Sequence, residues 1–190
     1  MKIIGISGAF ASGQDTLAQY LRDKHGFIWF STSDMVRKFS MERHGSIERP
    51  MLFETATHFR KTRGGGVFVE LGMEEFETLD NKVGLVLSGI RSMGEMNAVI
   101  HKLKGEMIYT DADPELRYER MVMRQRDAES QITREEFEKR EMAEWHVGDD
   151  ENDFNKRDIR AYCEEKDMIV YNASDLASFF HQAEQKLGLS

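Results

Sequence analysis

The chain has 190 residues, of which 40% are hydrophobic and 32% are charged. This length suits one compact domain with a sizeable core. Acidic side chains number 34 and basic side chains 26, and the formal net charge of −8 disfavours non-specific binding to nucleic acid or anionic membranes. A single cysteine, Cys163, excludes an intrachain disulfide and a cysteine-based zinc site. The sequence has neither a signal-peptide pattern nor an apolar run approaching about 18 residues, which favours a cytoplasmic protein.

Short apolar runs alternate with helical patterns along the chain, as in a parallel sheet covered on both faces. The expected strands cover residues 2–7, 27–31, 82–88, 106–111 and 167–172. Each strand is followed by a plausible helix, so a series of right-handed βαβ crossovers is the simplest topology. The sequence therefore predicts a three-layer α/β domain.

Two stretches are expected to lie outside this core. Residues 34–81 are too long for one crossover helix and contain three successive glycines, so they predict an inserted helical lobe. Residues 124–166 are highly charged and predict a lid region, with a charged helix over 133–145. The expected core is then residues 1–33, 82–123 and 167–190.

The most informative segment is G-A-F-A-S-G-Q-D-T, from Gly8 to Thr16. It follows the first strand, precedes a helix and keeps the glycine spacing of the phosphate loop G-x-x-x-x-G-K-[ST]. Gly8 and Gly13 permit backbone angles and close approaches that a side chain would block. Successive N–H groups then point inward at the start of a helix, which predicts a cradle for nucleotide phosphates.

The loop departs from the motif at two positions. Gln14 stands where the motif has lysine, and a missing electrostatic contact of this kind commonly costs about 10²–10³ in rate. Asp15 stands where the motif has serine or threonine; its carboxylate can hold Mg²⁺ directly, with the Thr16 hydroxyl nearby. The loop thus has one positive charge fewer and one negative charge more than G-K-S.

Several segments resemble nucleotide kinases of the P-loop superfamily. G-x-x-x-S-G-x-D-T at 8–16 looks like the phosphate loop of phage deoxynucleoside monophosphate kinases and of some dephospho-coenzyme A kinase-like proteins. S-T-S-D-M-V-R at 31–37 is similar to the element that opens the acceptor lobe of adenylate kinases. L-V-L-S-G-I-R at 85–91 resembles the strand end D-G-x-R, with Ser88 in place of the aspartate. Residues 111–126 and 170–176 are similar to the lid-entry helix and to the loop that receives adenine.

This resemblance implies a five-stranded parallel sheet in the order 2-3-1-4-5. It also implies phosphoryl transfer from ATP, with Mg²⁺, to a small nucleotide-type acceptor such as a nucleoside monophosphate or dephospho-coenzyme A. The residues expected to bind ATP are Gly8, Ala9, Phe10, Ala11, Ser12, Gly13, Gln14, Asp15, Thr16 and Asn172. Asp15 and Thr16 are the expected metal ligands. The expected acceptor residues are Thr32, Asp34, Arg37, Arg60 and Arg91. Arg91, Arg120, Arg124 and Arg126 are the expected catalytic residues. Together with Arg37, Arg60 and Arg63 they could supply charge in place of the missing lysine.

Other interpretations remain open. Gln14 and Ser88 equally suit a nucleotide-binding protein with weak or no kinase activity, which senses a ligand or acts through a partner, and a kinase for a non-nucleotide metabolite is a third possibility. Arg37 can pair with Asp34 on a neighbouring turn, and the arginines from Arg117 onward can form a solvated face. Arg60 can belong to a solvated loop end. The expected partner is a small molecule, with no nucleic acid and no membrane; the oligomeric state stays open, a homodimer included.

Overall fold

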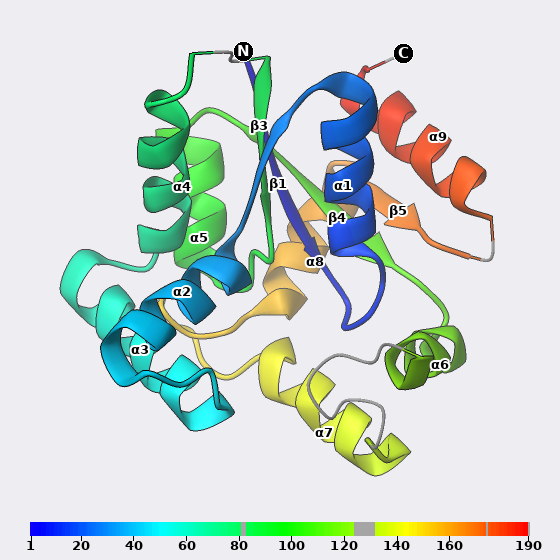
Figure 1. Ribbon diagram of the computed structural model, residues 1–190. Helices are drawn as coiled ribbons and strands as arrows, with labels where there is room; N and C mark the ends of the chain where they lie inside the picture. The colour runs from blue at the N-terminus through cyan, green and yellow to red at the C-terminus, as the bar shows by residue number, and fades with distance from the viewer. Residues whose placement is uncertain (81–82, 124–131, 174, 190) are drawn as a thin grey trace.

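The computed structural model describes residues 1–80, 83–123, 132–173 and 175–189, and Figure 1 shows how they are arranged. Parallel strands form one five-stranded sheet in the order β2-β3-β1-β4-β5, which confirms the order that the resemblance implied. The strands are β1 (Lys2–Gly8), β2 (Ile28–Ser31), β3 (Gly84–Ser88), β4 (Glu106–Asp111) and β5 (Ile169–Tyr171). Because all strands run the same way, their carboxyl ends meet at one edge of the sheet.

Some strand ends differ from the sequence prediction. β5 begins at Ile169 and not at residue 167, because Asp167 has a φ of 55°, in the left-handed region that a strand cannot contain. β2 begins at Ile28, since Phe27 is buried in the core without joining the ladder. β1 continues through Gly8 and so delivers the chain directly into the predicted phosphate loop.

Helices cover both faces of the sheet. Ile4 and Ile6 of β1 point to the face covered by α1 (Gln14–His25) and α9 (Leu176–Leu187). Ile3, one residue before Ile4, points to the opposite face, as the alternation of a strand requires. That face is covered by α4 (Val67–Glu77), α5 (Met93–Asn97), the π-helical turn η1 (Ala98–Lys102) and α8 (Lys156–Glu165). Burial of both faces explains why the strands read as continuous apolar runs.

The core extends further along the chain than expected. α4 falls in the range expected for the lobe, yet Val69 and Phe76 pack in the core under the sheet. α8 falls in the range expected for the lid, yet Ile159 and Cys163 are fully buried in the same cluster. Both helices have apolar faces that only the sheet is large enough to cover, so they belong to the core layer.

The remaining helices lie beyond the carboxyl edge of the sheet, in the lower half of Figure 1. They are α2 (Thr32–His44), α3 (Arg49–Arg63), α6 (Pro114–Met123) and α7 (Arg134–Trp145). α2 and α3 pack through the stacked rings of Phe39 and Phe59, whose centroids are 4.7 Å apart. α7 confirms the predicted charged helix, capped by the Thr133 hydroxyl. Within the described residues, every helix is too short or too polar to span a bilayer.

A polar cluster centred on the buried Glu184 joins α1 to α9. One carboxylate oxygen of Glu184 accepts hydrogen bonds from Lys24 at 2.7 Å and from Tyr20 at 2.7 Å, and lies 2.8 Å from His25. The Tyr20 ring also stacks on Phe180, with centroids 3.9 Å apart. These hydrogen bonds, that of Lys24 first, lower the pKa of Glu184 to about 2.

The Glu184 cluster predicts a pH-dependent contribution to stability. Its folded pKa lies below the unfolded value of roughly 4.3, so the carboxylate stabilises the fold fully above about pH 5 and loses this effect as pH falls towards 2. Glu184→Gln should lower the urea concentration at the unfolding midpoint at about pH 7. The decrease that the substitution causes should be about half as large at pH 3. The matched control is Glu42→Gln, at an exposed position of α2. An equal loss at both pH values would contradict this role.

Candidate functional site

The loop from Gly8 to Thr16 joins β1 to α1 and has the shape of an anion cradle. A Cβ on Gly8 would lie 2.2 Å from the Thr110 hydroxyl, and one on Gly13 would lie 2.3 Å from the Asn172 amide, so neither position tolerates a side chain. Gly13 also has a φ of 106°. Because Gly13 has no side chain with which to cap α1, the first-turn N–H groups and the positive helix end are available to an anion.

Neighbouring strands hold this loop in place. The Ser12 and Thr110 hydroxyls are 2.6 Å apart, and the Ala9 amide donates to the Thr110 carbonyl at 3.1 Å. Asn172, which follows β5, donates from its side-chain amide to the Ser12 carbonyl at 2.9 Å. The cradle is therefore fixed from β4 and β5 before any ligand arrives, which is the preorganisation that electrostatic binding requires.

Gln14 lies across the loop without supplying charge. Its Nε2 donates to the Gly8 carbonyl at 3.1 Å, which links the two ends of the turn. Arg117 contacts the loop backbone, since its guanidinium donates to the Phe10 carbonyl at 3.2 Å. Arg117 is buried and also pairs with Glu141 of α7, so the alternative that it lies on a solvated face is wrong.

Asp15 and Thr16 lie on different sides of the loop. The Asp15 carboxylate accepts from the Ser88 hydroxyl at 3.3 Å, at the end of β3. Thr16 instead lines a small cavity next to Asn172. Consecutive helical residues do not face each other, so the structure does not bring the two expected metal ligands together. Among the described residues no cluster of three His, Cys, Asp or Glu side chains could hold a metal.

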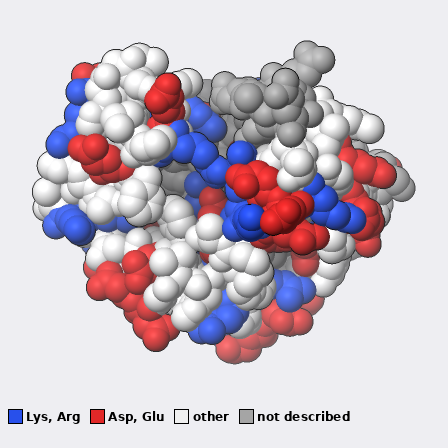
Figure 2. Space-filling model, turned by 90° about the horizontal axis from the view of Figure 1, so that it is seen from below, with Lys and Arg blue, Asp and Glu red and all other residues white. Residues whose placement is uncertain are grey.

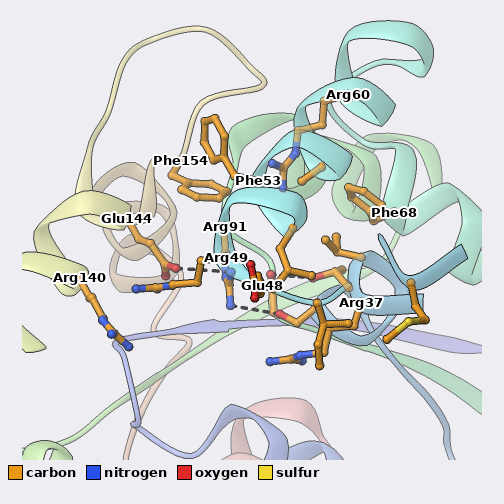
Figure 3. A pocket seen from close by; sticks show the side chains of 18 of the residues that line it. Arg37, Glu48, Arg49, Phe53, Arg60, Phe68, Arg91, Arg140, Glu144 and Phe154 are labelled. Carbon is orange, nitrogen blue, oxygen red and sulfur yellow. Dashed lines mark hydrogen bonds and ion pairs between the residues drawn. The ribbon is translucent and has the colours of Figure 1, made fainter. Parts of the chain in front are cut away.

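A cavity of about 750 Å³ opens between α2, α3, α7 and the carboxyl end of β3 (Figure 3). Phe10 brings the phosphate loop into its wall. Arginines and glutamates dominate its polar lining: Arg37, Arg49, Arg60, Arg91, Arg140, Glu48, Glu95 and Glu144. In Figure 2 basic side chains gather around a hollow on this face of an otherwise acidic molecule.

Arg91 occupies the centre of this cavity. Its guanidinium donates to the Ser33 hydroxyl at 3.1 Å and lies 3.4 Å from the carboxylate of Glu144 on α7. Glu144 also lies 2.7 Å from the buried ammonium of Lys156. Burial alone would raise the pKa of Glu144, but the charges of Arg91 and Lys156 outweigh it and hold the pKa at about 2. Arg91 therefore lines the cavity while the Glu144 carboxylate lies beside it.

The other expected acceptor residues divide into two groups. Thr32 and Arg37 line the cavity with Arg91, although Arg37 pairs with Asp34 at 2.8 Å, as the alternative interpretation held. The Asp34 side chain is exposed and is not among the cavity-lining residues. Arg60 does line the cavity, but it is buried and forms a 2.9 Å ion pair with Glu95, so it is not part of a solvated loop end.

A smaller cavity of about 300 Å³ lies on the other side of the loop. Ala11, Gly13 and Thr16 of the loop form one wall. Arg120 and Asn172 form part of the other, and Arg120 donates to the Asn172 side-chain oxygen at 3.0 Å and to its carbonyl at 3.1 Å. Arg124 and Arg126, expected near the transferred group, lie outside the described residues.

Sequence reasoning missed several residues of the larger cavity. Glu95 and Glu144 were not singled out, although each lies beside an arginine that was. Arg49 and Phe154 also line the wall. The capping pattern S-x-x-E at Ser92 was the one available signal, since its glutamate is Glu95.

Comparisons with known proteins bear on the fold. No protein-family model matches the chain. It is 29% identical to a UPF0200 protein of Methanococcus vannielii and 27% identical to a UPF0200 protein of Methanococcus maripaludis. Each match covers 131 residues, which is 68% of this chain. It covers 70% of the first protein and 71% of the second. Among solved structures, TT1252 from Thermus thermophilus matches with a TM-score of 0.65 and 20% identity, covering 99% of this chain and 96% of that one. A gluconokinase from Sinorhizobium meliloti matches with a TM-score of 0.54 and 12% identity, covering 99% and 92%.

The chain has a P-loop kinase-like fold. The match to both structures spans almost the whole chain. The loop from Gly8 to Thr16 and both cavities lie at the carboxyl ends of the strands, where open α/β sheets bind ligands.

The buried pair of Arg60 and Glu95 predicts a large effect on stability. Glu95 accepts from Arg60 and, in addition, from the backbone amides of Arg91 and Ser92. Glu95→Gln leaves a buried guanidinium without its counter-charge, so the free energy of unfolding should fall by about 3–5 kcal/mol. Glu74→Gln is the matched control, because Glu74 pairs with Arg63 on the surface and its loss should cost less than about 1 kcal/mol. Urea unfolding measures both; equal losses would contradict the prediction.

Proposed function

We propose that the protein transfers a phosphoryl group from ATP, with Mg²⁺, to a small nucleotide-type acceptor. The observation that carries this proposal is that two cavities meet at one phosphate loop. Phe10 lines the larger cavity, whereas Ala11, Gly13 and Thr16 line the smaller one. A transferase must hold donor and acceptor on opposite sides of the transferred group, and this arrangement provides two such subsites.

The smaller cavity suits the donor. The loop amides and the first turn of α1 would bind the ATP phosphates, and the space between Arg120, Asn172 and Leu176 would take the rest of the nucleotide. Mg²⁺, when bound with the nucleotide, neutralises charge on the phosphate oxygens. Asp15 is the carboxylate on the loop that fits it, because Mg²⁺ sites commonly use one or two carboxylates together with substrate phosphates.

The larger cavity suits an anionic acceptor. Arg91, with Arg37 and Arg49 on the neighbouring helices, can bind a phosphate through paired N–H donors. Apolar side chains complete the wall, among them Phe53, which is 67% exposed, and Phe154. Arginines beside exposed aromatic rings favour an acceptor that carries both a phosphate and a flat base, as nucleoside monophosphates and dephospho-coenzyme A do.

The decisive experiment is an acceptor screen. The protein, ATP and Mg²⁺ are incubated with ribo- and deoxynucleoside monophosphates and with dephospho-coenzyme A, and phosphorylated products are detected by mass spectrometry. Calorimetry with ATP measures binding separately from turnover. Formation of ADP together with one phosphorylated acceptor would support the proposal, and absence of ATP binding would overturn it.

Arg91 gives the sharpest test of the acceptor subsite. Arg91→Met should lower kcat/KM for the acceptor by about 10²–10³, because a cation facing the acceptor phosphate is removed. The dissociation constant of ATP should stay within about threefold, since Arg91 lines the larger cavity and not the smaller one. Arg157→Met, at an exposed pair on α8, is the matched control. An equal loss of ATP affinity would place Arg91 in the donor subsite instead.

A second candidate function is nucleotide binding without useful transfer. The observation that favours it is the neutral contact of Gln14 with the Gly8 carbonyl, where a lysine would carry charge to the phosphates. In this case the screen would show ATP binding without any phosphorylated product.

Gln14→Lys separates the two functions. If the arginines around the loop supply the charge, wild type is active and the variant should change kcat by less than about tenfold. If nothing replaces the lysine, the variant should gain about 10²–10³ in rate over a nearly silent wild type. We expect the first outcome. Gln14→Met is the control for shape, because it removes the bond to Gly8 without adding charge.

A further inference from the structure

We propose that Lys156 is a positioning residue of the acceptor subsite: its ammonium draws the Glu144 carboxylate away from Arg91, so that the Arg91 guanidinium stays available to an anionic ligand. Lys156 acts from behind the site, because it is not among the residues that line either of the two cavities. The inference rests on the proposed function in one respect, since it takes Arg91 as the group that binds the acceptor phosphate.

Lys156 occupies a position that is unfavourable for a cation. It is the first residue of α8, where the positive end of the helix dipole repels an ammonium group, and its side chain is only 6% exposed. Burial lowers the pKa of Lys156, while the charge of Glu144 acts in the opposite direction and favours the ammonium form. A buried ion pair contributes little net stability, so this pair calls for another explanation.

The two carboxylate oxygens of Glu144 are divided between two cations. Oε2 lies 2.7 Å from the Lys156 ammonium, whereas Oε1 lies 3.4 Å from the Arg91 guanidinium. A charge-assisted N–H···O bond is normally about 2.7–2.9 Å long, so the carboxylate contacts Lys156 closely and Arg91 only loosely. Arg91 donates instead to the neutral Ser33 hydroxyl at 3.1 Å, and its side chain is 31% exposed in the wall of the cavity (Figure 3). Part of the guanidinium therefore remains open to a ligand.

The charges of these groups explain why the lysine matters. Lys156, Glu144 and Arg91 together carry one net positive charge, and Arg91 is the most exposed of the three. Without Lys156 the same group would be neutral. Glu144 would then be free to turn both oxygens to Arg91 and to occupy the N–H donors that a phosphate needs. Arg49 also lowers the pKa of Glu144, but its effect is smaller than those of Arg91 and Lys156.

Backbone contacts keep Lys156 next to Arg91. Asn155, the residue before Lys156, donates its N–H to the Arg91 carbonyl at 2.9 Å. One residue earlier, Phe154 forms an antiparallel bridge with Ser92. The start of α8 is thus attached to the chain that follows β3, and the spacing of the two cations does not depend on α7, which carries the carboxylate.

The test measures anion binding at Arg91 with inorganic phosphate as the probe. Phosphate is titrated while the Arg91 side-chain N–H signal is followed by NMR, and Arg91→Met assigns the signal. Lys156→Met should raise the dissociation constant of phosphate about tenfold, within the range by which neighbouring charges are coupled. The ATP affinity of this variant, measured by calorimetry, should stay within about threefold of wild type, because Lys156 does not line the smaller cavity. An unchanged phosphate affinity overturns the inference.

Removal of the carboxylate separates this role from a purely structural one. The double variant Lys156→Met with Glu144→Gln has no carboxylate that could close on Arg91, so its phosphate affinity should return to within about threefold of wild type. A structural pair predicts a double variant at least as defective as Lys156→Met, and that result contradicts the inference. Lys139→Met is the matched control: it removes a lysine of α7 whose ion pair with Glu135 is exposed, and phosphate affinity should change less than about twofold.

A second comparison keeps the test valid if Lys156→Met does not fold. Glu144→Gln and the double variant differ only at residue 156, and neither has the carboxylate on which Lys156 acts. Each should bind phosphate no more than about threefold more weakly than wild type, and urea unfolding shows whether both are folded. A greater loss of phosphate affinity in either folded variant means that Glu144 or Lys156 supports Arg91 directly, which overturns the inference.

The outcomes also separate this inference from the proposed function. If phosphate leaves the Arg91 signal of wild type unchanged, the inference fails, although the acceptor screen can still find a product. If an acceptor is phosphorylated but phosphate affinity does not depend on Lys156, the inference alone fails. If the affinities follow the charges and no acceptor is phosphorylated, the inference stands and the cavity is an anion-binding site without transfer.

Discussion

The close approach of the β1–α1 turn to the neighbouring strands is the constraint on which the site depends. Gly8 lies against Thr110 of β4, and Gly13 lies against Asn172 beyond β5, with no room for a Cβ at either point. This contact aligns the loop with the strand ends that carry the remaining groups, Ser88 on β3 and Arg91 just after it. A larger residue at either glycine would displace the loop from all of them at once, because the strands are held rigidly by the sheet.

Internal carboxylates partner several arginines in and near the larger cavity of this acidic protein. Arg91 lies beside Glu144, Arg60 is paired with Glu95, and Arg117 is paired with Glu141. Such pairs offset the repulsion among the arginine side chains, and they hold each guanidinium in a defined direction. Two of the three carboxylates come from α7, so the packing of this helix and the charge of the cavity are linked. An anionic ligand that binds Arg91 has to compete with Glu144, which favours ligands whose phosphate offers several acceptor oxygens.

The sequence predicted the architecture better than the boundaries. Unbroken apolar runs such as residues 2–7 indicated buried parallel strands, and the glycine spacing correctly located the tight turn between β1 and α1. Length and the three glycines predicted a lobe over residues 34–81, and charge predicted a lid over 124–166. Neither signal shows that α4 and α8 within these ranges pack on the sheet. Glu144 was missed for a similar reason: in a chain with 32% charged residues, a glutamate on a charged helix has the pattern of a solvated side chain. Only the tertiary contact with Arg91 and Lys156 reveals it.

On the proposed function, the altered loop also changes which groups attract the phosphates. Gln14 keeps a hydrogen bond across the turn but removes a fixed cation, and Asp15 adds an anion at the start of α1. A carboxylate there is favourable to the helix dipole yet repels a polyphosphate, so backbone amides alone have to work against it. On the proposed function, arginines from outside the loop and a divalent ion at Asp15 supply the positive charge that the loop lacks. Binding in this protein is therefore expected to depend more on the metal than in a loop with its own lysine, because the carboxylate is repulsive until a cation neutralises it.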